Sequence, residues 1–177
     1  MARRETSSPL RVVVMRHGPA EARDPSRWPD DARRPLRAKG VTQTRRAARG
    51  LLRHLDRVDR LATSRAVRAR RTAEIVRAEL GRAPPLETWD ELASGERAGP
   101  ILARLAGAAR PRETVVLVGH EPTLAEFVGL ALVGEGISIV RLTKAGAVLL
   151  EFPAAVKPGA ARLVWALTRK QLAAARG

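Results

Sequence analysis

Two short, fully apolar runs constrain the fold of this chain more than any other feature. Residues 12–15 read VVVM and residues 115–118 read VVLV, and neither run alternates apolar with polar residues. A strand with one solvated face alternates, whereas a strand covered on both faces of a parallel sheet is apolar throughout. The two runs therefore predict strands over 10–15 and 114–118 inside a sheet that is covered on both sides.

The segments between these runs alternate between helical and extended patterns. After Gly40, apolar residues recur at helical spacing with arginines between them. Ser64 is placed to cap a helix that runs to about Leu80. The expected elements are helices over about 41–55, 64–80, 101–108 and 122–133, a strand over 58–62, and long loops over 18–39 and 83–99.

The last third of the chain has a different pattern. ISIVRLTKAGAVLLEF, from residue 137, and ARLVWALT, from residue 161, are alternating runs rich in strand-forming residues, with Lys-Ala-Gly as a turn signal. These runs predict antiparallel strands at a sheet edge. The whole pattern indicates an α/β fold, a three-layer αβα sandwich on a mainly parallel sheet. With 177 residues, 45% of them apolar, we expect a flexible basic lead over 1–9 and a single domain over 10–177.

Composition excludes several classes of protein. The net charge is +15, but the arginines are scattered along every segment, and aromatic residues make up 3% with no tyrosine, so we do not expect a nucleic-acid partner. No apolar run is long enough to span a bilayer, and the start does not resemble a signal peptide. Without cysteine there are no disulfides or thiolate metal sites. We therefore expect a cytoplasmic protein without membrane attachment.

Each apolar strand run is followed closely by a histidine. Arg16, His17 and Gly18 follow the first run, and His120 follows the second. Ligands of open parallel sheets bind outside the carboxyl ends of the strands, so one crevice can hold both histidines. His54, within an arginine-rich helical pattern, is interpreted as a surface residue.

These residue types suit the transfer of a phosphoryl group. Arg16 offers a planar fork of donors for phosphate oxygens, and Arg68 can reach the same point from the next strand end. A neutral His17 can attack phosphorus, and a protonated His120 can donate to a phosphoryl oxygen. Gly18 leaves room for a closely approaching ligand. Residue spacing alone leaves this chemistry open.

The motifs along the chain resemble those of the histidine phosphatase superfamily, and more narrowly the SixA group of short phosphohistidine phosphatases. The matching stretches are VVVMRHGPAE, RRPLRAKG, SRAVRARRTAEIV, VVLVGHEPTL and WALTRKQL. The resemblance implies a phosphoglycerate mutase-like fold, His17 as nucleophile, Arg16 and Arg68 as clamps, His120 as the second histidine, and no metal or cofactor. It also places Glu91 where many members carry a general acid. The family typically has proline and glutamine where this chain has Arg65 and Arg71, and we expect these two and Arg70 on a solvated helix face.

The resemblance implies a metal-independent phosphatase that forms phospho-His17, releases phosphate and acts on protein phosphohistidine. Neither long loop is large enough to form a lid domain, so the site can admit a phosphorylated side chain of another protein. Two further hypotheses stay open: a broad phosphomonoesterase for small phosphate esters, and a non-catalytic basic module that binds polyanions. A metallohydrolase using His17 and His120 ranks last, because no His-x-x-x-His pair or carboxylate cluster supports it.

Overall fold

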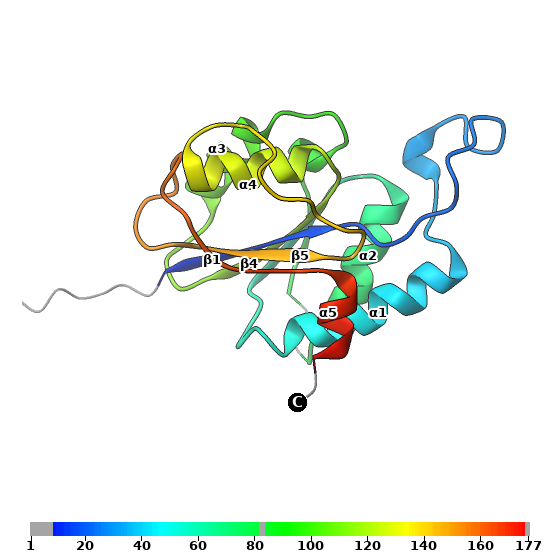
Figure 1. Ribbon diagram of the computed structural model, residues 1–177, viewed down its shortest axis with the longest axis horizontal. Coiled ribbons are helices and arrows are strands. Elements are labelled where there is room, and N and C mark those ends of the chain that lie inside the picture. Colours follow the sequence, from blue (N-terminus) through cyan, green and yellow to red (C-terminus); the bar gives the residue numbers. More distant parts are fainter. Residues whose placement is uncertain (1–8, 82–83, 176–177) are drawn as a thin grey trace, which may run out of the picture.

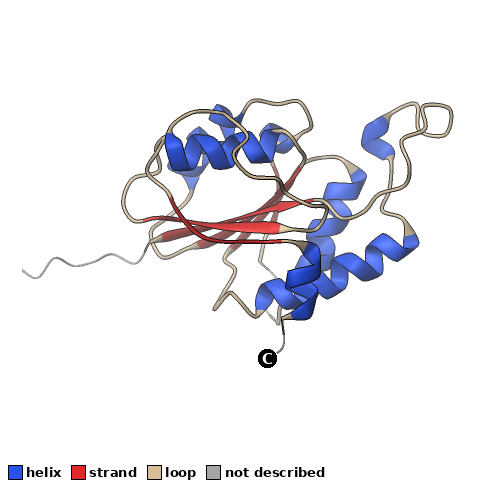
Figure 2. Cartoon of the chain, in the orientation of Figure 1, coloured by secondary structure: helices blue, strands red, loops and turns tan. Residues whose placement is uncertain are grey.

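The computed structural model describes residues 9–81 and 84–175 as one central sheet with helices on both of its faces (Figures 1 and 2). All but the last residue of the expected basic lead over 1–9 lies outside the described residues. The layers are those of the αβα sandwich predicted from the sequence. The predicted fold class, an α/β sandwich on a mainly parallel sheet with antiparallel edge strands, is therefore confirmed.

The sheet has six strands in the order β3-β2-β4-β1-β5-β6. In that order they are Leu86–Thr88, Arg60–Thr63, Thr114–Gly119, Leu10–Arg16, Ala147–Phe152 and Arg162–Leu167. The first four run parallel, and β5 and β6 are antiparallel additions at one edge. The two apolar runs are thus neighbouring strands, β1 and β4, at the centre of the sheet. Their register pairs Arg16 with Gly119, so both strands end at the same level.

The two faces of the sheet are covered by different numbers of helices. Figure 1 shows the two helical layers. One face carries α3 (Ala98–Ala108) and α4 (Thr123–Val133), and the other carries α1 (Ala38–Leu52), α2 (Val67–Ala78) and α5 (Arg169–Ala174). Short 3₁₀ helices, Asp31–Arg33 and Asp90–Leu92, lie in the loops.

The central strands are apolar throughout because successive residues enter different cores. Val12 and Val14 join the core beneath α3 and α4, whereas Val13 and Met15 join the core beneath α1 and α2. All four side chains are fully buried. Each such burial stabilises the fold by roughly 1.5–3 kcal/mol, which explains why no polar residue interrupts the run.

Three local predictions from the sequence were wrong. Ser64 does not cap α2, which begins after Ala66; the Ser64 hydroxyl bonds His120 instead. Residues 83–99 are not only loop, since they contain β3 and the second 3₁₀ helix. Residues 137–143 form no strand, although their pattern alternates.

The segment 137–143 is irregular because its backbone is bound elsewhere. The N–H of Leu142 donates to the Glu121 carboxylate, and its carbonyl accepts from Arg16. The same segment passes so close to α4 that a Cβ on Gly129 would lie 1.9 Å from the carbonyl oxygen of Ile137. Backbone groups occupied in this way are not free for a sheet ladder.

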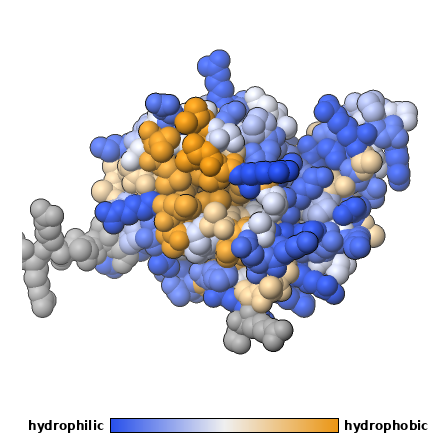
Figure 3. Space-filling view, in the orientation of Figure 1, coloured by the Kyte–Doolittle hydropathy of each residue, from blue (hydrophilic) through white to orange (hydrophobic). Residues whose placement is uncertain are grey.

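Apolar surface gathers over α4 and the neighbouring strands on the face shown in Figure 3. The large exposed apolar side chains among the described residues are Val67, Val133, Ile137, Ile139, Leu163 and Val164. Among the described residues, no helix has both the length and the apolar character needed to cross a membrane.

Candidate active site

The ends of β1 and β4 bring the two strand-end histidines into contact. The ring centroids of His17 and His120 lie 5.0 Å apart, with the rings tilted by 52°. The backbone N–H of His17 donates to the carbonyl of Gly119 at 3.0 Å, which continues the β1–β4 ladder by one bond past the last strand residue. Residues more than one hundred positions apart in the sequence thus line one site.

The ring of His17 is oriented by its own backbone neighbour. Nδ1 lies 2.7 Å from the carbonyl oxygen of Gly18, an acceptor, so Nδ1 carries the proton and Nε2 presents a lone pair. Burial is the largest influence on this ring and lowers its pKa to about 3, while the Gly18 bond acts to raise it and the nearby charges of His120, Arg68 and Arg16 act to lower it further. His17 is therefore uncharged at neutral pH, the form that a nucleophile requires.

His120 has the complementary arrangement. Its Nε2 lies 2.8 Å from the Ser64 hydroxyl, and its Nδ1 is buried with no hydrogen-bond partner. When Ser64 donates to Nε2, Nδ1 carries the hydrogen and presents it to the site. Burial first, and then the positive charge of Arg68, lower the pKa of His120 to about 4. A protonated donor is expected from the sequence; a neutral imidazole in this tautomer can also donate from Nδ1.

Two arginines flank the histidine pair, and each is held by a backbone carbonyl. Arg16 donates from Nη1 to Leu142 at 2.9 Å, and Arg68 donates from Nη1 to the carbonyl of Asp31 at 2.6 Å. The Asp31 carboxylate also lies 3.0 Å from Nη2 of Arg68. Burial lowers the pKa of both guanidinium groups. The Nε atoms of both arginines are buried without an acceptor.

Buried donors without acceptors cluster at this site. Seven buried side-chain nitrogen or oxygen atoms in the described part of the chain have no hydrogen-bond partner, and six of them can donate. Three of these six belong to Arg16, Arg68 and His120. A buried donor that finds no acceptor costs about 1–3 kcal/mol. Three such donors on residues at or beside the histidine pair suit an anion with several acceptor oxygens, such as a phosphoryl group.

Gly18 is required by packing against α1. A Cβ at this position would lie 2.0 Å from Oγ1 of Thr44 and 3.3 Å from Leu36. Its N–H donates to Oγ1 of Thr72 at 2.9 Å. From the sequence, Gly18 is expected to leave room for a ligand, and the structure shows in addition that α1 approaches closely at this position. The two Thr72 bonds, to Gly18 and to the carbonyl of Arg68, tie the β1 end to α2.

Arg65 and Glu91, two other residues considered from the sequence, have their contacts elsewhere. Arg65 is 76% exposed and pairs with Asp90. Both oxygens of Glu91 accept from Nη1 of Arg104 on α3, at 3.1 and 2.9 Å. Arg70 and Arg71 both pair with Glu74 on the exposed side of α2, in agreement with the expected solvated face.

Sequence reasoning missed Ser64 and Asp31 as parts of this site. Ser64 follows the end of β2 directly, so the rule that ligands gather at strand ends, which singled out His17, also applied to it. Asp31 carried no such signal, because only the folding of the long 18–39 loop brings its carboxylate to Arg68. Among the described residues, no group of three or more His, Cys, Asp or Glu side chains is arranged to hold a metal ion.

Comparisons with known proteins agree with this geometry. Residues 12–95 match the model of the histidine phosphatase superfamily, branch 1. An uncharacterised protein of a Picosynechococcus strain is 35% identical over 156 residues, which cover 87% of this chain and 88% of the relative.

Solved structures with the same fold include several phosphatases. The protein histidine phosphatase SixA in complex with tungstate superposes with a TM-score of 0.76 at 23% identity, over 92% of this chain and 99% of its own. The putative phosphohistidine phosphatase SixA of Nakamurella multipartitia gives 0.74 at 26% identity, over 92% and 97%. The fold is shared more widely, since a phosphoserine phosphatase of Entamoeba histolytica gives 0.65 at 13% identity, over 92% and 99%.

Proposed function

Because the chain belongs to the histidine phosphatase superfamily and is a phosphatase, we propose that it removes phosphoryl groups from protein phosphohistidine through a covalent intermediate on His17. The observation that carries the proposal is the pair of imidazoles 5.0 Å apart, with unpartnered donors of Arg16, Arg68 and His120 around them. In the proposal the protein acts in the cytoplasm, and its partner is another phosphorylated protein.

In the first step, the Nε2 lone pair of His17 attacks phosphorus. The bond between phosphorus and the leaving nitrogen breaks, and its electron pair stays on the leaving imidazole. His17 becomes a phosphoimidazolium whose Nδ1–H still donates to the Gly18 carbonyl, so the new positive charge is stabilised by the contact that oriented the ring. Arg16, Arg68 and His120 donate to the three phosphoryl oxygens as charge develops on them.

In the second step, water attacks the phosphorus on the face opposite Nε2. The P–Nε2 bond breaks, its electron pair returns to His17, and the water proton leaves with inorganic phosphate or to solvent. The residues assigned to the two steps need no metal ion or organic cofactor. The same three donors serve both steps, because the phosphoryl oxygens carry similar charge in each.

The contact of Glu91 with Arg104 supports a phosphoramidate rather than a phosphate ester as substrate. An alkoxide leaving group needs a proton, and the carboxylate considered as its source is bound to Arg104. An imidazole that already carries a proton on its other nitrogen leaves as a neutral molecule without an acid. The fold shared with SixA phosphatases points in the same direction.

A small phosphate ester is the second candidate substrate. A cluster of basic side chains next to Arg16 favours it, and so does the fold shared with a phosphoserine phosphatase. The two candidates differ in leaving group, so a substrate comparison separates them. Higher kcat/KM for phosphoserine or a sugar phosphate than for a phosphohistidine protein would replace the first candidate by the second.

The intermediate is tested with a phosphohistidine peptide that carries ³²P. The enzyme is quenched in alkaline denaturant, because phosphohistidine is labile to acid, and the labelled residue is mapped. We expect label on His17, and none in a His17→Asn variant. A His54→Asn variant, which changes an exposed histidine, is the matched control and should label normally. Turnover of the peptide without label on any histidine of the enzyme would refute the covalent mechanism.

A further inference from the structure

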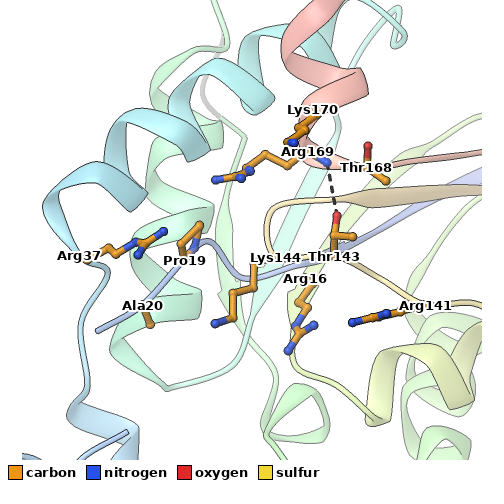
Figure 4. A pocket seen from close by; sticks show the side chains of 10 residues that line it. All are labelled: Arg16, Pro19, Ala20, Arg37, Arg141, Thr143, Lys144, Thr168, Arg169 and Lys170. Atoms are coloured by element: carbon orange, nitrogen blue, oxygen red, sulfur yellow. Dashed lines mark hydrogen bonds between the residues drawn. The ribbon is translucent and has the colours of Figure 1, made fainter. Parts of the chain in front are cut away.

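A basic pocket includes Arg16 of the candidate active site in its lining, and Figure 4 shows the side chains that line it. Its cavity volume is about 480 Å³. Four segments far apart in the sequence line it: the loop after β1, the start of α1, the turn before β5 and the start of α5. The basic side chains among its lining are those of Arg16, Arg37, Arg141, Lys144, Arg169 and Lys170, and no carboxylate lines it.

None of these six cations takes part in an ion pair among the described residues. Arginines elsewhere, such as Arg60 and Arg65, are paired with carboxylates across neighbouring elements. Glu121, whose charge acts on Arg16, accepts the backbone N–H of Leu142 and is not part of the pocket lining. Within the described part of the chain, no ion pair therefore neutralises the cations of the pocket.

Two details describe the surroundings of these side chains. Nη1 of Arg169 is buried without a hydrogen-bond partner, although its backbone N–H is bound to Oγ1 of Thr143 (dashed line in Figure 4). Burial, followed by the charges of Arg16, Arg34 and Arg37, lowers the pKa of Lys144. Like charges that face one cavity repel each other, and an anion that binds between them offsets this cost.

We propose that this pocket binds a second anionic group, phosphate or carboxylate, of the molecule whose phosphoryl group reacts at His17. The inference rests on the proposed function and narrows its substrate class to phosphoryl donors that carry another negative charge nearby. Arg16 joins the two sites, because its guanidinium lines the pocket and its buried Nε belongs to the phosphoryl site. Arginine forks suit the bidentate binding of phosphate or carboxylate.

The test compares matched substrates that differ only in the second charge. The small-molecule pair is an alkanediol bisphosphate, with chains of three to six carbons, against the alkyl monophosphate of the same length. The peptide pair is a phosphohistidine peptide with flanking glutamates against the same peptide with glutamines. Each pair is measured with the wild type, with Arg141→Gln/Lys170→Gln, and with Lys157→Gln/Arg162→Gln, a control that removes two exposed charges outside the pocket.

We expect the pocket variant to raise KM about tenfold or more for the doubly anionic member of at least one pair. Its KM and kcat for the singly anionic member should stay at the wild-type value, which also shows that the variant is folded. The pair that responds identifies the source of the second anion. Equal effects on both members of each pair, or the same effect in the control variant, would overturn the proposal. Labelling of His17 is measured alongside, so a failed subsite is distinguished from a failed phosphatase mechanism.

Discussion

The histidine site and the basic pocket are neighbours that share Arg16, yet they hold their charges in opposite ways. In the histidine site, Arg68 is 4% exposed, and backbone carbonyls hold both arginines. In the pocket, most of the basic side chains, such as Arg141 and Lys170, are exposed to solvent. The arginines of the histidine site are thus held by hydrogen bonds to backbone carbonyls, whereas most cations of the pocket face solvent.

This difference suggests that the histidine site carries out the chemical steps and that the pocket contributes to substrate binding. A charge interaction in a buried site is several times stronger than the same interaction in water, and a donor already held in place needs no reorganisation as charge develops. Exposed charges are screened by salt and have to order long side chains on binding. Changes in the histidine site should therefore act on kcat, and changes in the pocket on KM.

Removal of the nucleophile gives the largest expected effect. His17→Ala should lower kcat by roughly 10⁴-fold or more, because no other group in the site is placed to accept the phosphoryl group. Single-turnover kinetics with a phosphohistidine peptide measure it. A loss confined to KM would contradict the division between the two regions.

The two arginines beside the histidine pair come next. Arg68→Gln and Arg16→Gln should each lower kcat by about 10²–10³-fold, since each removes a preorganised donor to the phosphoryl oxygens. The matched control is Arg65→Gln, one helical turn from Arg68, which is 76% exposed and paired with Asp90. Its effect on kcat should stay within about twofold. Similar losses in Arg65→Gln and Arg68→Gln would show that burial does not decide which arginine acts.

Stability should depend on pH through the buried histidines. The unfolded chain takes up protons on both rings as the pH falls below about 6.5, while the folded chain keeps His120 neutral to about 4 and His17 to about 3. The unfolded state then binds more protons, so the free energy of unfolding falls with falling pH. Between pH 7 and pH 5 the loss is about 2 kcal/mol for each histidine.

Denaturant titrations across this pH range measure that loss. In the His17→Asn variant, the free energy of unfolding should fall by about 2 kcal/mol less between pH 7 and pH 5, because one buried histidine is gone. In the His54→Asn variant, which changes an exposed ring, the pH dependence of the wild type should remain. If the His17→Asn variant keeps the same slope of unfolding free energy against pH, the ring of His17 takes up its proton in the folded state as it does in the unfolded state.

Glu91 allows a smaller test of the leaving group. Glu91→Gln should change kcat for a phosphohistidine peptide by less than about threefold, because a protonated imidazole leaves without an acid. Rates for phosphohistidine and for a phosphate ester are compared in the same variant. If the peptide rate falls by two orders of magnitude, Glu91 is the proton donor despite its bonds to Arg104.

The smallest effect should come from salt. Raising NaCl from about 0.05 M to about 0.5 M should increase KM for a doubly anionic substrate several-fold and leave kcat nearly unchanged, since screening acts on the exposed pocket. The Arg141→Gln/Lys170→Gln variant should lose much of this dependence. A fall in kcat of the same size would place the screened charges in the histidine site instead.

Sequence patterns predicted those parts of the fold that rest on local chemistry. The runs at 12–15 and 115–118 indicated the central strands, because a strand covered on both faces excludes polar residues. The same rule placed His17 and His120 at one sheet edge, and the structure brings their rings to 5.0 Å. The alternating pattern at 137–143 predicted a strand, and this prediction was wrong because the backbone of Leu142 is bound to the side chains of Arg16 and Glu121 rather than to a neighbouring strand.

By itself, then, the sequence determined that the apolar runs of the central strands are buried, where those two strands end and which family motifs the chain carries. Those properties depend on residue type and on short-range spacing. Tertiary structure alone decided that Arg68 is buried against Asp31 while Arg65 faces solvent, and that six cations from four segments line one cavity. The physical reason is that burial and electrostatic fields depend on distances through space, and the folding of the loops sets those distances.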